Sequence, residues 1–240
     1  MKKGLAFGLS AALCAVMIGY FGYQSVTHRA LHKEAEEKFN AMLKGYELFR
    51  DKYVHNDPSI MQYLSEYGQK PRAVVVACSD SRVDPALLLQ CDPGDLFVIR
   101  NVANIVPPYD KNGIDHGTSA ALEFGLRFLK VKHLIILGHS ECGGIKGAIN
   151  CSDDRPNDFI DNWVSLVKIN VHASCKETDE YAKIALHNSY ANCLTYPWIK
   201  ERIKRKDLTI HVWFFDIKTG QIFAYSETEK AYKPLSVVAL

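Results

Sequence analysis

Short apolar runs alternate with helical patterns through the middle of the chain. Ala73–Ala77, Leu96–Ile99 and His133–Leu137 are rich in β-branched and other apolar residues, as is typical of strands covered on both faces. Between the last two, Gly117–Lys130 spaces its apolar residues as a helix does. Buried strands alternating with helices predict an α/β fold, with a mostly parallel central sheet flanked by helices.

The C-terminal third continues this pattern and then changes it. Asp158–His172 and Glu177–Leu194 have helical spacing, and Leu208–Asp216 has the composition of a strand. A turn then leads into Gln221–Tyr225, so the last two segments predict a hairpin that adds an antiparallel edge strand. The polar stretch Asp153–Asp158 is expected to be a surface loop.

The segment before the first strand predicts an N-terminal helical extension. Apolar residues recur at helical spacing in His28–Tyr53, for example at Ala35, Phe39 and Met42, which indicates an amphipathic helix. A second, short helix is expected at Pro58–Tyr67.

The first 25 residues differ from the rest of the chain. Lys2 and Lys3 precede the almost uncharged run Gly4–Tyr23, whose length of about 20 residues is close to that of a membrane-spanning helix. Residues 1–25 are therefore predicted to be a signal peptide or an N-terminal membrane anchor, and residues 26–240 the folded domain. The absence of a small-x-small cleavage pattern near Gln24 favours the anchor. Either alternative implies export, with the domain in a bacterial periplasm or tethered through residues 4–23 to the inner membrane facing it.

Charge and cysteine content narrow the possible partners. The 29 basic and 27 acidic residues give a net charge of +2, too small to favour a nucleic-acid partner. The spacing of the seven cysteines is not that of a small disulfide scaffold. Export would still permit pairing among Cys91, Cys151, Cys175 and Cys193.

Reactive side chains concentrate where two predicted strands end. Cys78-Ser79-Asp80-Ser81-Arg82 follows the first strand, and Gly138-His139-Ser140-Glu141-Cys142-Gly143-Gly144 follows the strand 133–137. Ligands of open α/β sheets bind at this edge. Two thiolates and an imidazole, from Cys78, His139 and Cys142, suit tetrahedral zinc, and three protein ligands leave the open position of a catalytic site.

These two blocks, together with Arg100-Asn101-Val102-Ala103-Asn104, resemble in order and spacing the signature blocks of the β-class carbonic anhydrases. The resemblance runs from about Leu43 to Tyr225. It implies one zinc ion per chain on Cys78, His139 and Cys142, and reversible hydration of carbon dioxide to bicarbonate and a proton. It also implies a homodimer or a higher homo-oligomer.

The resemblance further assigns catalytic roles to Asp80 and Arg82. Asp80 would orient the reacting water, and Arg82 would keep Asp80 ionised. In one subgroup of the family the counterpart of Asp80 binds the metal instead, supported by a tryptophan three residues before the first zinc cysteine. Val75 occupies that position here. The sequence thus resembles the plant-type, open-site subgroup.

Four more positions match residues that contact substrate in the family. Gln69 matches a glutamine that binds the substrate oxygen, often from the neighbouring subunit. Phe97 and Val102 match apolar positions lining the carbon dioxide pocket, and Gly143 matches a backbone N–H that faces the bound anion. Phe124 stands where plant-type members often carry a tyrosine.

Two other functions fit the same metal ligands. Relatives with this zinc constellation hydrolyse carbon disulfide or carbonyl sulfide, and substrate access separates those activities from carbon dioxide hydration. A non-catalytic zinc-binding protein would need neither Asp80 and Arg82 nor Gln69.

Overall fold

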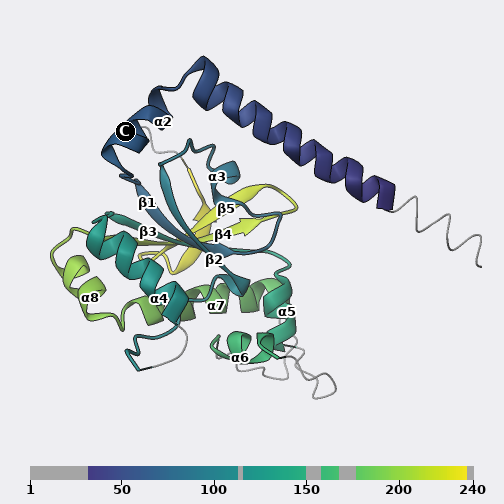
Figure 1. Cartoon of the computed structure of the whole chain (residues 1–240). Coiled ribbons are helices and arrows are strands. Elements are labelled where there is room, and N and C mark those ends of the chain that lie inside the picture. The colour runs from purple at the N-terminus through teal and green to yellow at the C-terminus, as the bar shows by residue number, and fades with distance from the viewer. Residues whose placement is uncertain (1–31, 113–115, 150–157, 168–176, 237–240) are drawn as a thin grey trace, which may run out of the picture. The chain divides into compact units, whose positions relative to one another are not determined.

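The computed structural model describes residues 32–112, 116–149, 158–167 and 177–236 (Figure 1). The chain forms two compact units, Met1–Glu66 and Tyr67–Leu240. In the first, a helix spans residues 32–50 and continues as a π-helical turn, η1 (Asp51–Asn56). The short helix α2 (Ser59–Tyr67) follows. The predicted N-terminal helical extension is therefore present.

The second unit is built on a six-stranded sheet in the order β2-β1-β3-β4-β5-β6 (Figure 1). The first four strands in this order pair in parallel, and β5 and β6 are antiparallel. This confirms the predicted mostly parallel α/β sheet, although its antiparallel edge has two strands where the sequence indicated one. The strands are β1 (Ala73–Cys78), β2 (Leu96–Asn101), β3 (His133–His139), β4 (Thr209–Asp216), β5 (Gln221–Ser226) and β6 (Ala231–Pro234).

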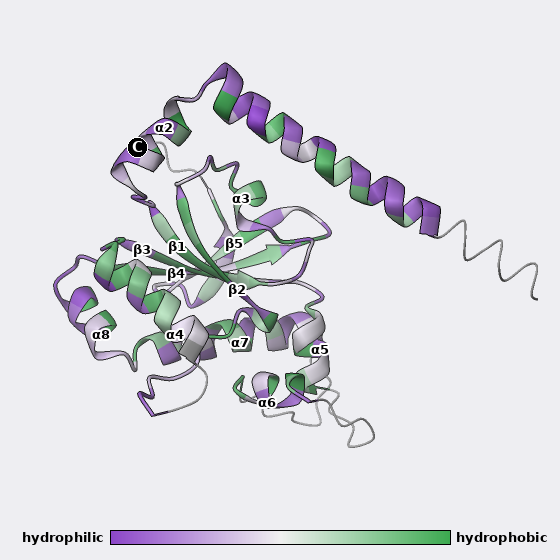
Figure 2. Cartoon of the chain, in the orientation of Figure 1, coloured by the Kyte–Doolittle hydropathy of each residue, from purple (hydrophilic) through white to green (hydrophobic). Residues whose placement is uncertain are grey.

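Burial explains why the central strands have uninterrupted apolar sequences. All six residues of β1 are buried, and so is β3 from its second residue onward. Figure 2 shows the same strands as strongly hydrophobic. A strand covered on both faces has no solvent-facing position for a polar residue, so β1 and β3 form the centre of the core.

Helices connect and cover the strands. They are α3 (Pro85–Leu88), η2 (Val102–Asn104), α4 (His116–Glu123), η3 (Phe124–Phe128), α5 (Gly143–Ile149), α6 (Ile160–Ser165), α7 (Thr178–Cys193) and α8 (Pro197–Lys204). The predicted helix 117–130 is thus an α-helix to Glu123 and a π-helical segment beyond it.

Two of these elements pack on the same face of the sheet. Phe97 of β2 pairs in register with Val74 of β1, and Val74 pairs with Leu134 of β3. Gly138 shares the face of Leu134 because side chains alternate along a strand. Phe124 of η3 stacks on Phe97 with ring centroids 5.8 Å apart, and Leu186 of α7 lies against Gly138. One face of the sheet is therefore covered by two helical elements from different parts of the chain, η3 over β2 and α7 over the end of β3.

Some predictions fall on residues that the structure does not describe. The predicted helix 158–172 is seen as α6, and its last residues lie outside the described ranges. The targeting segment 1–25 and most of the loop 153–158 also lie outside them. Among the helices that are described, none combines the length and apolar character needed to cross a membrane.

Candidate metal centre

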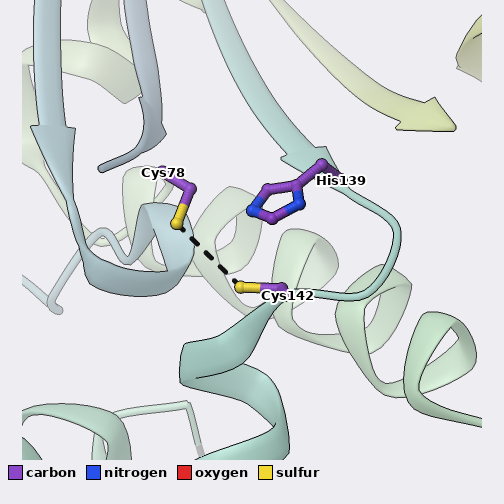
Figure 3. Close-up of side chains that lie close together, drawn as sticks. All are labelled: Cys78, His139 and Cys142. Atoms are coloured by element: carbon purple, nitrogen blue, oxygen red, sulfur yellow. Dashed lines mark hydrogen bonds between the residues drawn. The ribbon is translucent and has the colours of Figure 1, made fainter. Parts of the chain in front are cut away.

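Three side chains converge at the carboxyl edge of the sheet. Cys78, His139 and Cys142 are 4%, 0% and 1% exposed, and their ligand atoms all lie within 4.8 Å of one another. The sulfurs of Cys78 and Cys142 are 4.0 Å apart, and the imidazole of His139 lies beside both (Figure 3). The three predicted metal ligands thus form one buried cluster.

The parallel sheet brings these residues together. Cys78 is the last residue of β1 and His139 the last residue of the adjacent strand β3. Cys142 follows a tight turn in which Glu141 has a φ of +56°. The backbone N–H of Glu141 donates a hydrogen bond of 2.8 Å to the carboxylate of Asp179 in α7, which stabilises this uncommon conformation.

Close packing fixes the end of β3. A Cβ atom at Gly138 would lie 2.9 Å from Cγ of Leu186 in α7. Only glycine allows the helix to approach this closely, directly before the ligand His139.

The imidazole of His139 is arranged as a metal ligand. Its Nδ1–H donates to the carbonyl of Ser140 at 2.8 Å, which leaves Nε2 as the free acceptor. This Nε2 is buried and has no hydrogen-bond partner in the described part of the chain, a costly condition that metal binding would relieve.

The donor set fits zinc. Tetrahedral zinc with thiolate bonds of about 2.3 Å separates two sulfurs by about 3.8 Å, close to the 4.0 Å observed. A hydrogen bond between the two thiols lowers the pKa of Cys78 to about 4 against the opposing effect of burial. The pKa of Cys142 is raised by the same hydrogen bond and by burial. Cys78 is therefore the readier thiolate of the pair.

Asp80 lies beside the cluster and is paired with Arg82. The carboxylate accepts hydrogen bonds from Nε and one terminal nitrogen of Arg82 at 2.9 and 2.7 Å. These bonds hold the pKa of Asp80 well below its usual range despite partial burial. Its Oδ2 is 4.0 Å from Nε2 of His139. Asp80 is therefore an ionised acceptor next to the ligand atoms.

Arg100 holds the loop that carries Cys78 and Asp80. Its guanidinium donates to the carbonyls of these two residues at 3.0 and 2.7 Å and to the carboxylate of Asp84 at 2.9 Å. Asp84 in turn caps α3. The sequence places Arg100 in one of the three signature blocks but did not predict its contact with this loop. An arginine at the carboxyl end of an apolar strand is a usable signal, because a partly buried guanidinium requires several acceptors.

The predicted substrate residues divide into two groups. Val102 immediately follows β2 beside Cys78 and lines an open, mainly apolar pocket of about 600 Å³ together with Ser79 and Trp163. Gly143 is exposed and directly follows Cys142. These residues lie at the cluster.

Gln69 and Phe97 are not brought to the cluster of their own chain. Gln69 is exposed and precedes β1, at the opposite end of that strand from Cys78, about 17 Å away along the strand alone. Phe97 lies four residues before the carboxyl end of β2 and packs against Phe124.

Trp163 is a site residue that the sequence did not reveal. Its indole Nε1 donates to the carbonyl of Val102 at 2.8 Å. The available signal was general: a half-buried tryptophan usually finds an acceptor for its N–H, but the sequence does not say which one.

Known proteins share these features. A family model described as carbonic anhydrase matches residues 73–222. A carbonic anhydrase of Synechocystis sp. is 34% identical over 194 residues, covering 77% of this chain and 70% of that protein. Beta carbonic anhydrase 3 of Arabidopsis thaliana is 32% identical over 229 residues, covering 82% and 88%.

Solved structures agree with the sequence matches. The β-carbonic anhydrase CcaA superposes with a TM-score of 0.73 at 32% identity, covering 84% of this chain and 94% of that one. A tetrameric β-carbonic anhydrase of Sordaria macrospora superposes with a TM-score of 0.64 at 33% identity, covering 78% and 96%. With its buried Cys-His-Cys cluster at the edge of the same sheet, the chain belongs to the β class of the carbonic anhydrase family.

Proposed function

We propose that this protein catalyses the reversible hydration of carbon dioxide to bicarbonate and a proton, with one zinc ion per chain held by Cys78, His139 and Cys142. One observation carries the proposal: the three side chains converge in a buried cluster in which Nε2 of His139 has no hydrogen-bond partner among the described residues. Zinc bound at such a site lowers the pKa of a coordinated water toward about 7 and so supplies a nucleophile at neutral pH.

Asp80 orients the reacting water in this proposal. Oδ1 of Asp80 accepts two hydrogen bonds from Arg82, one from the backbone N–H and one from Nε. Oδ2 accepts one from Arg82 and faces His139. A carboxylate oxygen has two lone pairs, so Oδ2 can also accept the hydrogen of the water and direct an oxygen lone pair at the substrate.

Arg82 keeps Asp80 in the ionised, accepting state and fixes its orientation. A terminal nitrogen of Arg82 also donates to the carbonyl of Glu141 at 3.3 Å. This contact joins the two loops that carry the zinc ligands. The position of Asp80 is therefore set relative to both loops.

The pocket beside the cluster suits an uncharged substrate. Val102, Phe159 and Trp163 contribute apolar surface to its lining, which favours carbon dioxide over a charged molecule. Gly143 retains the role predicted for it, in which its backbone N–H faces the bound anion.

Gln69 and Phe97 would act from a neighbouring subunit. Both lie away from the cluster of their own chain, so a site that uses them needs a second copy. We therefore propose a homodimer or a multiple of one, in keeping with the tetrameric relative from Sordaria macrospora.

The zinc site is proposed to be of the open, plant-type kind. Val75, fully buried in β1, has no N–H in its side chain to hold an anion. The pairing of Asp80 with Arg82 supports the same assignment, because a carboxylate bound in this way is turned toward the arginine. Bicarbonate would then act as a product without a second, cooperative inhibitory role.

The alternatives explain less of the site. A zinc reservoir would not need the Asp80–Arg82 pair. Hydrolysis of carbon disulfide or carbonyl sulfide, an activity of other relatives, uses the same zinc ligands, so the ligands alone do not separate it from carbon dioxide hydration. The ratio of carbon dioxide hydration to carbon disulfide hydrolysis, measured on the same preparation, separates the two enzymes.

Metal analysis with stopped-flow carbon dioxide hydration tests the proposal on the full chain. We expect about one zinc per chain, and loss of zinc and activity in Cys78→Ala, His139→Ala and Cys142→Ala, because each removes a third of the protein ligation. Cys91→Ala is the matched control, since Cys91 is a free cysteine outside the cluster. Full zinc content in any of the three variants would remove that residue from the ligand set.

We further propose that residues 1–25 export the protein to a bacterial periplasm, either released or tethered through residues 4–23. Lys2, Lys3 and the apolar run Gly4–Tyr23 support this. Cell fractionation tests it, and recovery of the full-length chain in the cytosol would refute it.

A further inference from the structure

A strained turn lies against the first zinc ligand. In η2, which directly follows β2, Ala103 and Asn104 have φ values of +63° and +46°. Such values are uncommon for residues other than glycine and persist only where surrounding contacts fix them. This conformation directs the backbone N–H of Ala103 at Sγ of Cys78, 3.4 Å away.

The other end of the same peptide group is also bound. The carbonyl of Val102 and the N–H of Ala103 belong to one peptide unit. Nε1 of Trp163, 61 residues further along the chain, donates to that carbonyl at 2.8 Å. The indole and the sulfur of Cys78 therefore lie at opposite ends of a single peptide dipole.

Hydrogen bonds in such a chain strengthen one another. A donor at the carbonyl polarises the peptide and makes its N–H a better donor to the sulfur. The turn is also held from a second side, because a Cβ atom at Gly144 would lie 2.5 Å from Cγ1 of Val102. Packing thus fixes the side chain of Val102, while Trp163 fixes its carbonyl.

We propose that Trp163 is a positioning residue for the zinc ligand Cys78, acting through the Val102–Ala103 peptide. This inference rests on the zinc site of the proposed function. The indole N–H holds the peptide so that its own N–H faces the thiolate, withdraws electron density from the sulfur and orients it for the metal. Outer-shell groups of this kind tune both metal affinity and ligand basicity.

The test is the cobalt(II)-substituted full-length protein carrying Trp163→Phe, which keeps an aromatic ring and removes the N–H. Losing a hydrogen bond makes the thiolate more electron-rich, so the sulfur-to-cobalt charge-transfer band should move to longer wavelength. Zinc affinity, measured by competition with a chromogenic chelator, should fall about tenfold, the lower end of the range for outer-shell changes. A role confined to packing would leave the band in place.

Trp198→Phe is the matched control. Trp198 is also a half-buried tryptophan packed against the core, but it lies in α8 and contacts the ring of Tyr196. Its substitution should change neither the band nor the affinity. Replacing Trp163 with benzothienylalanine, in which sulfur takes the place of the N–H, preserves the bulk of the ring and decides the question if Trp163→Phe is poorly folded.

The outcomes separate the two proposals. If the unsubstituted protein binds no zinc, the proposed function fails. If the unsubstituted protein binds zinc, and both Trp163 variants have the same charge-transfer band position and the same zinc affinity as the unsubstituted protein, the role of Trp163 is refuted.

Discussion

Asp80 and Arg82 are joined by three hydrogen bonds although one residue separates them in the chain. The backbone N–H and Nε of Arg82 donate to Oδ1 of Asp80, both at 2.9 Å, and a terminal nitrogen donates to Oδ2 at 2.7 Å. The two side-chain bonds form a planar fork that only a guanidinium can make. The orientation of the carboxylate therefore depends on the shape of Arg82 as well as on its charge.

Arg82→Lys should lower kcat/KM for carbon dioxide hydration about 100-fold, in the range of displaced acid–base groups, while zinc content stays near one per chain. Lysine keeps the positive charge but cannot bind both carboxylate oxygens in one plane. Stopped-flow hydration with metal analysis measures both quantities. Arg72→Lys, which alters the exposed ion pair with Asp95, should behave as the unsubstituted protein. An Arg82→Lys enzyme of normal activity would show that the fork has no catalytic role.

Gly138→Ala should lower the free energy of unfolding by about 1–3 kcal/mol, the usual cost of overpacking a core. The added methyl group would meet Leu186 at 2.9 Å. Urea unfolding measures the change. Gly147→Ala in α5 is the control, because within the described ranges no atom outside its own helical backbone lies within 4 Å of its Cβ position, and alanine should stabilise that helix slightly. The double variant Gly138→Ala/Leu186→Ala should lose less free energy of unfolding than the sum of the losses in the two single variants, because the smaller side chain at position 186 leaves room for the added methyl group. Additive effects would argue against this contact.

Mixed oligomers should reveal that Gln69 acts across subunits. Gln69 lies at the opposite end of β1 from Cys78, so it cannot serve its own site. Gln69→Ala and Asp80→Asn should each be nearly inactive alone. When the two are co-expressed with different tags, half of randomly formed dimers are mixed and contain one intact site, which restores about a quarter of normal activity. Mixed oligomers with no activity above that of the separate variants would contradict this arrangement.

The free energy of unfolding should decrease as the pH falls from about 7 to 5, in part because of His211. Burial and the neighbouring His133, whose Nδ1 is 3.1 Å from Nε2 of His211, lower the pKa of His211 in the folded chain. Below the unfolded pKa of about 6.5 the unfolded chain therefore binds more protons, and acid favours unfolding. Thermal unfolding across this range should show a weaker pH dependence in His211→Gln. In His133→Gln the pH dependence of stability should be weakened less than in His211→Gln, because His211 is still present and its burial still lowers its pKa. Equal pH dependence in all three proteins would exclude His211 as a contributor.

The zinc cluster was predictable because its positions follow from strand ends. β1 and β3 are recognisable from their apolar runs, and the rule that ligands bind at the carboxyl edge of a parallel sheet places Cys78 near His139. The helix α8 and the strand β6 were not predicted. β6 is short and polar, and it is held through backbone pairing with β5, for example between Tyr232 and Tyr225, which leaves no apolar pattern in the sequence.

The supporting residues were hidden for a different reason. The contact of Trp163 with Val102 spans 61 residues. The three acceptors of Arg100 all lie between the end of β1 and the start of α3, before Arg100 in the chain. Neither set of contacts follows a regular sequence spacing from which it could be recognised. Such contacts depend on how the helices and loops pack after the sheet has formed.

Metal uptake by this chain is also a check on the alignment of its strands. Val74 to Ala77 of β1 pair in order with Leu134 to Leu137 of β3, and successive side chains point to opposite faces. A slip of β1 by one residue would move Cys78 by about 3.3 Å along β3 and turn its side chain to the other face of the sheet, so its sulfur would lose its present position within 4.8 Å of the other two ligand atoms. Cys78 ends β1, and His139 and Cys142 lie at the end of β3 and in the turn after it, more than 50 residues away. The ion can therefore select the correctly aligned sheet from misaligned intermediates during folding.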